Sequence, residues 1–213
     1  MQNLQNITRI FDIAIPLMLY FIWDWDLHFI LLFAYLDAIT GIIVSAVKEY
    51  KIERTRRIEA SKFKQRFLTY ALFGILGILF FELAIAQIYP EMQLRESFID
   101  FLLFKELGIP QIVWIVPLVI LLNYQQYQIQ FIKSRVFELM PLNYLANNHR
   151  NTWLFFAISG LFIFGLSTLV KGTPLLFLFV IIGFKALVDF IIIPLLDKQF
   201  VQQFVNSPHD FKR

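Results

Sequence analysis

Six long apolar stretches are the feature that most constrains how this chain can fold. They run from about Ile10 to Trp23, Leu27 to Val47, Phe67 to Tyr89, Ile109 to Ile132, Trp153 to Val170 and Pro174 to Leu196. A helix needs about 20 apolar residues to cross the hydrocarbon of a bilayer, where its backbone must satisfy its own hydrogen bonds. The composition agrees, since 58% of the residues are hydrophobic and 16% are charged. The sequence therefore predicts one integral membrane domain over residues 1–213, an all-α polytopic bundle of about six transmembrane helices.

The first stretch is the weakest of the six, because it is short and contains Pro16. It either begins earlier, near Gln5, and crosses fully, or it forms a re-entrant or interfacial segment. Asp12 interrupts it and no small-residue cleavage site follows, so we expect it to remain on the mature protein. In the fourth stretch Pro117 predicts a kink. Residues 91–107 predict a short helix that packs against protein.

The distribution of Lys and Arg predicts the orientation. Fifteen of these cations fall at the N-terminus, in the loops 48–66 and 133–152 and in the C-terminal tail, against three in the remaining loops. Positive residues resist translocation, which places both termini in the cytoplasm. The basic loop 48–66 also contains Glu49, Glu53 and Glu59, and we interpret it as a topology signal that contacts lipid. No nucleic-acid-binding motif accompanies it.

Ionisable residues at membrane depth are the candidate functional groups, because each costs about 2.5–3.5 kcal/mol to insert. Five lie within the spans: Asp12, Asp37, Glu82, Lys185 and Asp189. Asp12 is close to the surface and is interpreted as hydrated. In a structural interpretation Lys185 is neutralised by Asp189 on its own helix and by Asp37 across the bundle. In a functional interpretation one carboxylate exchanges a proton and gates an ion or proton path.

Two further polar segments are ambiguous. Residues 123–130, NYQQYQIQ, either line a watery vestibule, bond to neighbouring helices or mark where the fourth helix leaves the hydrocarbon. His149 is interpreted as a surface or capping residue, because no second histidine stands at metal-ligand spacing. Phosphate-binding, dinucleotide and nucleophile-elbow motifs are absent from the sequence, which predicts no enzymatic activity, metal or cofactor.

Several short motifs together resemble a known family. They are WDWDL (23–27), FAYLDAITG (33–41), RVFELMPL (135–142) with His149, and Lys185 with Asp189 four residues on. They resemble an uncharacterised bacterial family of six-span membrane proteins, a domain of unknown function. Asp37 matches the acid of its second span, whereas Ala38, Pro194 and Asp197 depart from its pattern. The segment DAITGIIVSAVK (37–48) is also faintly similar to phage holins. Neither resemblance implies an activity.

Two functions are compatible with these observations. The absence of a soluble domain or catalytic motif favours an accessory or scaffold protein that acts with membrane lipids and with other membrane subunits or further copies of itself. The alternative is a small transporter or channel. Its ion-path candidates are Asp37, Glu82, Asn123, Lys185 and Asp189.

Overall fold

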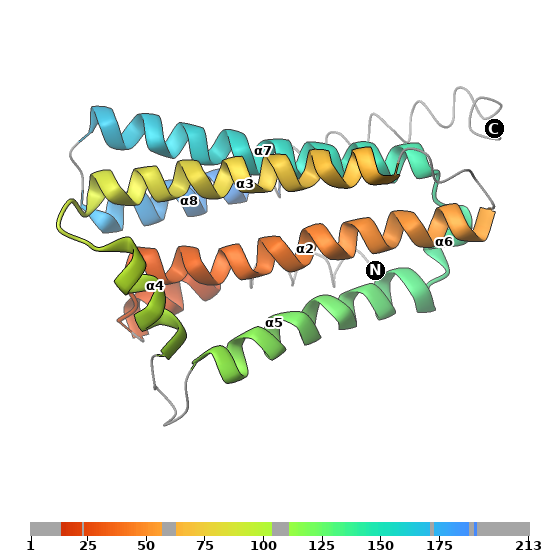
Figure 1. The fold of residues 1–213 in the computed structure, drawn as a ribbon, viewed down its shortest axis with the longest axis horizontal. Helices are drawn as coiled ribbons and strands as arrows, with labels where there is room; N and C mark the ends of the chain where they lie inside the picture. Colours follow the sequence, from red (N-terminus) through yellow and green to blue (C-terminus); the bar gives the residue numbers. More distant parts are fainter. Residues whose placement is uncertain are drawn as a thin grey trace. The chain divides into compact units, whose positions relative to one another are not determined.

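The computed structural model describes residues 14–22, 24–56, 63–103, 111–170, 173–187 and 190, which are almost entirely helical and contain no strand. After a helical stretch over 14–22 come α2 (Leu27–Arg56), α3 (Phe63–Ile88), α4 (Leu94–Leu103), α5 (Gln111–Gln126), the π-helix η2 (Tyr127–Lys133), α6 (Val136–Leu139), α7 (Leu142–Leu169) and α8 (Pro174–Leu187) (Figure 1). The chain forms two compact units. One comprises residues 31–171 and the other residues 1–30 and 172–213.

In the terminal unit, residues 24–26 lie directly before the start of α2. Asp24 adopts a left-handed conformation with φ of 54°, and the carboxylate of Asp26 accepts a 2.7 Å hydrogen bond from the amide of Phe29. An aspartate in this place satisfies an amide that the first helical turn leaves free. The WDWDL motif thus contains the N-cap of α2.

Helices α3 and α7 pack along each other in the 31–171 unit (Figure 1). Gly77 of α3 contacts Gly160 of α7, and Phe80, farther along α3, contacts Phe164, farther along α7. The two helices therefore run parallel. A Cβ atom on Gly160 would lie 2.7 Å from the carbonyl oxygen of Gly77. Small residues therefore allow the two backbones to approach closely, as in many membrane helix pairs.

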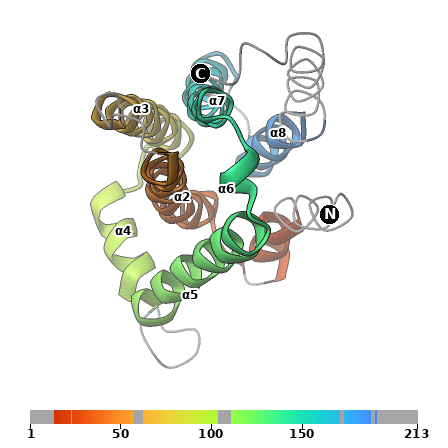
Figure 2. The same cartoon turned by 90° about the vertical axis from the view of Figure 1, so that its right-hand side faces the viewer.

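Helix α2 lies between α3 and α5 (Figure 2). It runs antiparallel to α3 and α7, with which it shares a core of Ala38, Ile42, Tyr70 and Trp153. Its last turns pack against η2 and α7 in a second cluster centred on Ile52, Phe131, Leu142 and Leu145. Together the two clusters anchor α2 along most of its length.

Among the described residues, three helices are long and apolar enough to cross a membrane: α2, α3 and α7. Helix α8 is apolar but shorter, with 14 described residues. The predicted fourth span is divided into α5, which contains Pro117, and the π-helix η2. The short helix predicted within 91–107 is confirmed as α4, whose Phe101 is buried.

The predicted loop boundaries on one side of the bundle are wrong. Residues 48–56 and 63–66 were expected in a loop but continue α2 and α3, and residues 142–152 form the first turns of α7. At about 1.5 Å per residue, the 30 residues of α2 span about 45 Å, well beyond a hydrocarbon core of about 30 Å. These extra turns carry the polar cluster described next.

Candidate functional site

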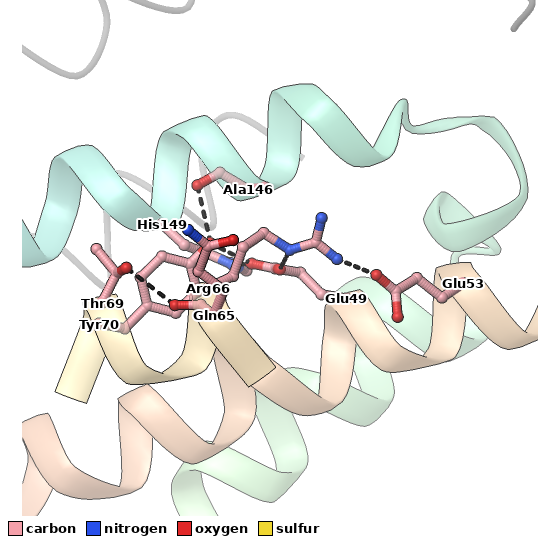
Figure 3. A network of polar contacts seen from close by, with 8 residues as sticks. All are labelled: Glu49, Glu53, Gln65, Arg66, Thr69, Tyr70, Ala146 and His149. Atoms are coloured by element: carbon pink, nitrogen blue, oxygen red, sulfur yellow. Dashed lines mark hydrogen bonds and ion pairs between the residues drawn. The ribbon is translucent and has the colours of Figure 1, made fainter. Parts of the chain in front are cut away.

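A buried polar cluster joins the extended ends of α2, α3 and α7 (Figure 3). We call it the Glu49 cluster, and it consists of Glu49 and Glu53 from α2, Arg66 and Tyr70 from α3, and His149 from α7. Glu49 and Glu53 are one helical turn apart, as are Arg66 and Tyr70. This spacing directs each pair to one face of its helix.

Glu49 is the centre of the cluster. Its Oε1 accepts a 2.8 Å hydrogen bond from the hydroxyl of Tyr70 and lies 2.8 Å from Nδ1 of His149. Its Oε2 lies 2.8 Å from Nε of Arg66. An ionised carboxylate only accepts hydrogen bonds, so with Glu49 ionised the donor in this contact is Nδ1 of His149. One carboxylate on α2 therefore holds side chains from both neighbouring helices.

Arg66 bridges the two acids of α2. Its guanidinium also pairs with Oε1 of Glu53. The second oxygen, Oε2 of Glu53, is buried and has no hydrogen-bond partner among the described residues. The Tyr70 hydroxyl lies 3.0 Å from the carbonyl of Ala146, a further link to α7. Two carboxylates thus share one guanidinium in an enclosed space.

The two acids of the cluster are almost fully enclosed. The side chains of Glu49 and Glu53 are 1% and 3% exposed, while that of Arg66 is 19% exposed and forms the side nearest to solvent. Among the described residues, no group of three or more His, Asp or Glu side chains could hold a metal ion. The arrangement can fasten three helices together, and its chemistry is that of a buried ion-pair network.

Asp37 and Asn123, two of the predicted candidates, come together between α2 and α5. Nδ2 of Asn123 donates a 2.8 Å hydrogen bond to Oδ1 of Asp37 and lies 3.1 Å from the hydroxyl oxygen of Thr40. For Asn123, the interpretation as a bond to a neighbouring helix is confirmed. Farther along the same segment, Gln128 bonds instead to Tyr124 of its own helical stretch, at 3.0 Å.

Four further charged candidates remain. Glu82 lies on α3, and its carboxylate interacts electrostatically with the buried hydroxyl of Tyr35 on α2. Lys185 lies on α8, in the terminal unit, so its pairing with Asp37 stays a prediction. Asp12 and Asp189 are outside the described residues.

Sequence reasoning missed the Glu49 cluster, and its interpretation of His149 as a surface or capping residue is wrong. His149 is 9% exposed and lies two turns inside α7. Glu49 and Glu53 were assigned to the loop 48–66 because the apolar stretch before it ends at Val47. The available signal was their four-residue spacing on either side of the apolar Ile52, which indicates a helix with one buried face.

Comparisons with known proteins do not extend this description. No protein-family model matches the chain, and no curated protein and no solved structure shows significant similarity to it. The resemblance to a six-span family therefore stays a prediction from short motifs.

Proposed function

We propose that this protein is a polytopic scaffold or accessory subunit of a bacterial inner membrane, with about six spans and both termini in the cytoplasm. Three membrane-length apolar helices and the strong bias of Lys and Arg toward one set of loops support this topology. Their directions are compatible with it, because α2 runs antiparallel to α3 and α7.

The observation that carries the proposal is that polar side chains join neighbouring helices. Glu49 ties α2 to α3 and α7, and Asn123 ties α5 to α2. A buried carboxylate satisfied from three sides and barely exposed is suited to holding helices in one arrangement. The outward faces of the same helices remain apolar, as at Leu72 and Ile75 of α3. A rigid bundle with apolar faces is what a membrane-embedded scaffold requires.

The test is purification of the tagged full-length protein from membranes in a mild detergent, followed by quantification of the proteins that accompany it. A scaffold should retain one membrane subunit, or further copies of itself, at constant stoichiometry. Glu49→Gln, which disturbs the bundle, should reduce that stoichiometry, whereas Glu138→Gln at an exposed position should not. A monomeric protein free of partners under these conditions would contradict the proposal.

A second function is favoured by one observation. Asp37 is exposed on the 31–171 unit although the sequence places it near the middle of a span, and Asn123 and Thr40 extend the polar surface beside it. A carboxylate at this depth needs water, a proton or a cation. If the protein is a transporter or channel, proteoliposomes containing it should show proton or cation flux, and Asp37→Asn should abolish that flux.

A further inference from the structure

We propose that the end of the bundle where α2 ends and α3 and α7 begin binds the headgroups of anionic phospholipids. The surface, which we call the basic end, consists of five exposed cations: Arg54 on α2, Lys64 on α3, Lys133 at the end of η2, Arg135 and, on α7, Arg150. The inference rests on the membrane location proposed above.

Acidic and basic residues are interspersed in the sequence of this region but differ in exposure in the structure. Glu49 and Glu53 alternate with cations along the chain, which weakens any prediction of an anion-binding surface. In the structure both acids are buried, at 1% and 2% exposure, and both pair with Arg66. Among the described residues of these turns, Glu138 is the one acid left exposed. Glu49 and Glu53 are buried while the five cations of the basic end are exposed, so the described part of this surface is more positive than the mixed sequence suggests.

Other cations near the basic end are already engaged within the protein. Arg56 donates hydrogen bonds to the carbonyls of Glu138 and Met140, at 3.0 and 2.9 Å. Lys51 lies 5.3 Å from the ring centroid of Phe137. These contacts fasten the end of α2 to α6, so the exposed cations project from a fixed framework. A preorganised surface binds anions at a smaller entropic cost than a flexible basic tail.

The depth of these cations favours lipid over a soluble partner. Lys64 precedes the apolar window of α3 by three residues, Arg150 precedes that of α7 by three, and Lys133 follows that of the fourth stretch directly. At about 1.5 Å per residue, all three lie within about 5 Å of the hydrocarbon, inside the headgroup layer. Arg54 lies about 10 Å from it. Phosphate groups of the surrounding leaflet are the anions present at that depth.

Lipid binding to the full-length protein tests the proposal. The protein is first reconstituted in nanodiscs, which tests whether it enters a membrane. It is then transferred to a neutral detergent and titrated with phosphatidylglycerol or phosphatidylcholine of identical acyl chains. Bound lipids are counted by native mass spectrometry. Each cation near an anionic surface contributes about fivefold in affinity. We therefore expect at least a tenfold preference for phosphatidylglycerol, and a marked loss of this preference when salt rises from about 0.05 to 0.5 M.

The decisive variant combines Arg54→Gln, Lys64→Gln, Lys133→Gln and Arg150→Gln, and it should lose most of the preference. The matched control is Arg95→Gln, which removes an exposed cation from α4 and should change the preference less than twofold. Elution volume and helix content are compared for both variants. If the quadruple variant does not fold, the salt dependence of the native protein decides the matter by itself.

Three outcomes would overturn the proposal: equal affinity for the two lipids, a preference that salt does not weaken, or equal effects of the quadruple variant and Arg95→Gln. Displacement of phosphatidylglycerol by a short RNA at equimolar concentration would indicate a nucleic-acid surface and would also overturn it. Failure of the protein to enter nanodiscs at all would instead contradict the membrane function proposed above, so the two failures are distinguishable.

Discussion

At the scale of single residues, Glu49 should contribute most to stability among the charged side chains. Removing the acceptor of a buried donor costs roughly 1–3 kcal/mol per donor, because the donor stays desolvated and unpaired. Replacing Glu49 with Ala would remove the acceptor that Tyr70 and His149 share, and it would leave Arg66 paired with Glu53 alone. We expect a fall of about 3 kcal/mol in the free energy of unfolding, measured by denaturant titration in detergent micelles. Glu138→Ala, at an exposed position, should change it by less than about 0.5 kcal/mol.

Asn123 and Asp37 give a milder prediction at the same scale. Hydrogen bonds between membrane helices are worth about 0.6 kcal/mol on average and at most about 1.7. A double-mutant cycle of Asn123→Ala and Asp37→Ala should therefore yield a coupling energy in this range. Tyr124→Ala provides the control in combination with Asp37→Ala, since Tyr124 bonds to Gln128 of its own helical stretch. Strictly additive losses of unfolding free energy for Asn123→Ala and Asp37→Ala would show that the hydrogen bond does not contribute to stability.

The same residues show which parts of the site could be predicted from the sequence. Asp37 was identified because a charge inside an apolar run is conspicuous, and Asn123 because it begins a polar run. Glu49 and His149 were assigned to loops because the apolar pattern stops at the hydrocarbon boundary. Helices α2 and α7 continue beyond that boundary. A polar residue beyond that boundary is as compatible with a loop as with a helix. Only contacts with other helices distinguish the loop from the helix. The hydrogen-bond partners of Glu49 on α3 and α7 are 21 and 100 residues away in the sequence.

At the scale of elements, the crossing of α3 and α7 depends on glycine. A methyl group on Gly160 would be 2.7 Å from the carbonyl oxygen of Gly77, which belongs to the backbone and cannot rotate away. Gly160→Ala should therefore separate the two helices and cost about 1–3 kcal/mol. Gly165 lies on the same helix with nothing within 4 Å of such a methyl group. Gly165→Ala should be neutral or stabilising, since alanine favours a helix by up to about 1 kcal/mol over glycine. Equal destabilisation by both substitutions would mean that the close approach is not what limits packing.

The elements themselves were largely predictable, and their ends were not. Long apolar runs predicted α2, α3 and α7 correctly in place and type. The fourth stretch was predicted as one span, yet it changes from α5 to the π-helix η2 at Tyr127. A π-helix closes each backbone hydrogen bond over one residue more than an α-helix does, and this does not alter the apolar pattern enough to be recognised. Its stacked rings of Tyr127 and Phe131 are contacts that only the packed structure defines.

At the scale of the whole molecule, the orientation of the bundle yields the final prediction. The residues Gln65 and Gln93 are both exposed, and they lie at the start of α3 and just before α4, so α3 separates them along its full length. The native chain contains no cysteine, so single Gln→Cys variants at these positions can be compared without background. If positive loops remain in the cytoplasm, a membrane-impermeant thiol reagent added to intact cells should label position 93 and not position 65. Permeabilised cells should label both. Labelling of 65 alone in intact cells would invert the topology and move the basic end to the outer leaflet, whereas equal labelling in intact cells would show that α3 does not cross the membrane.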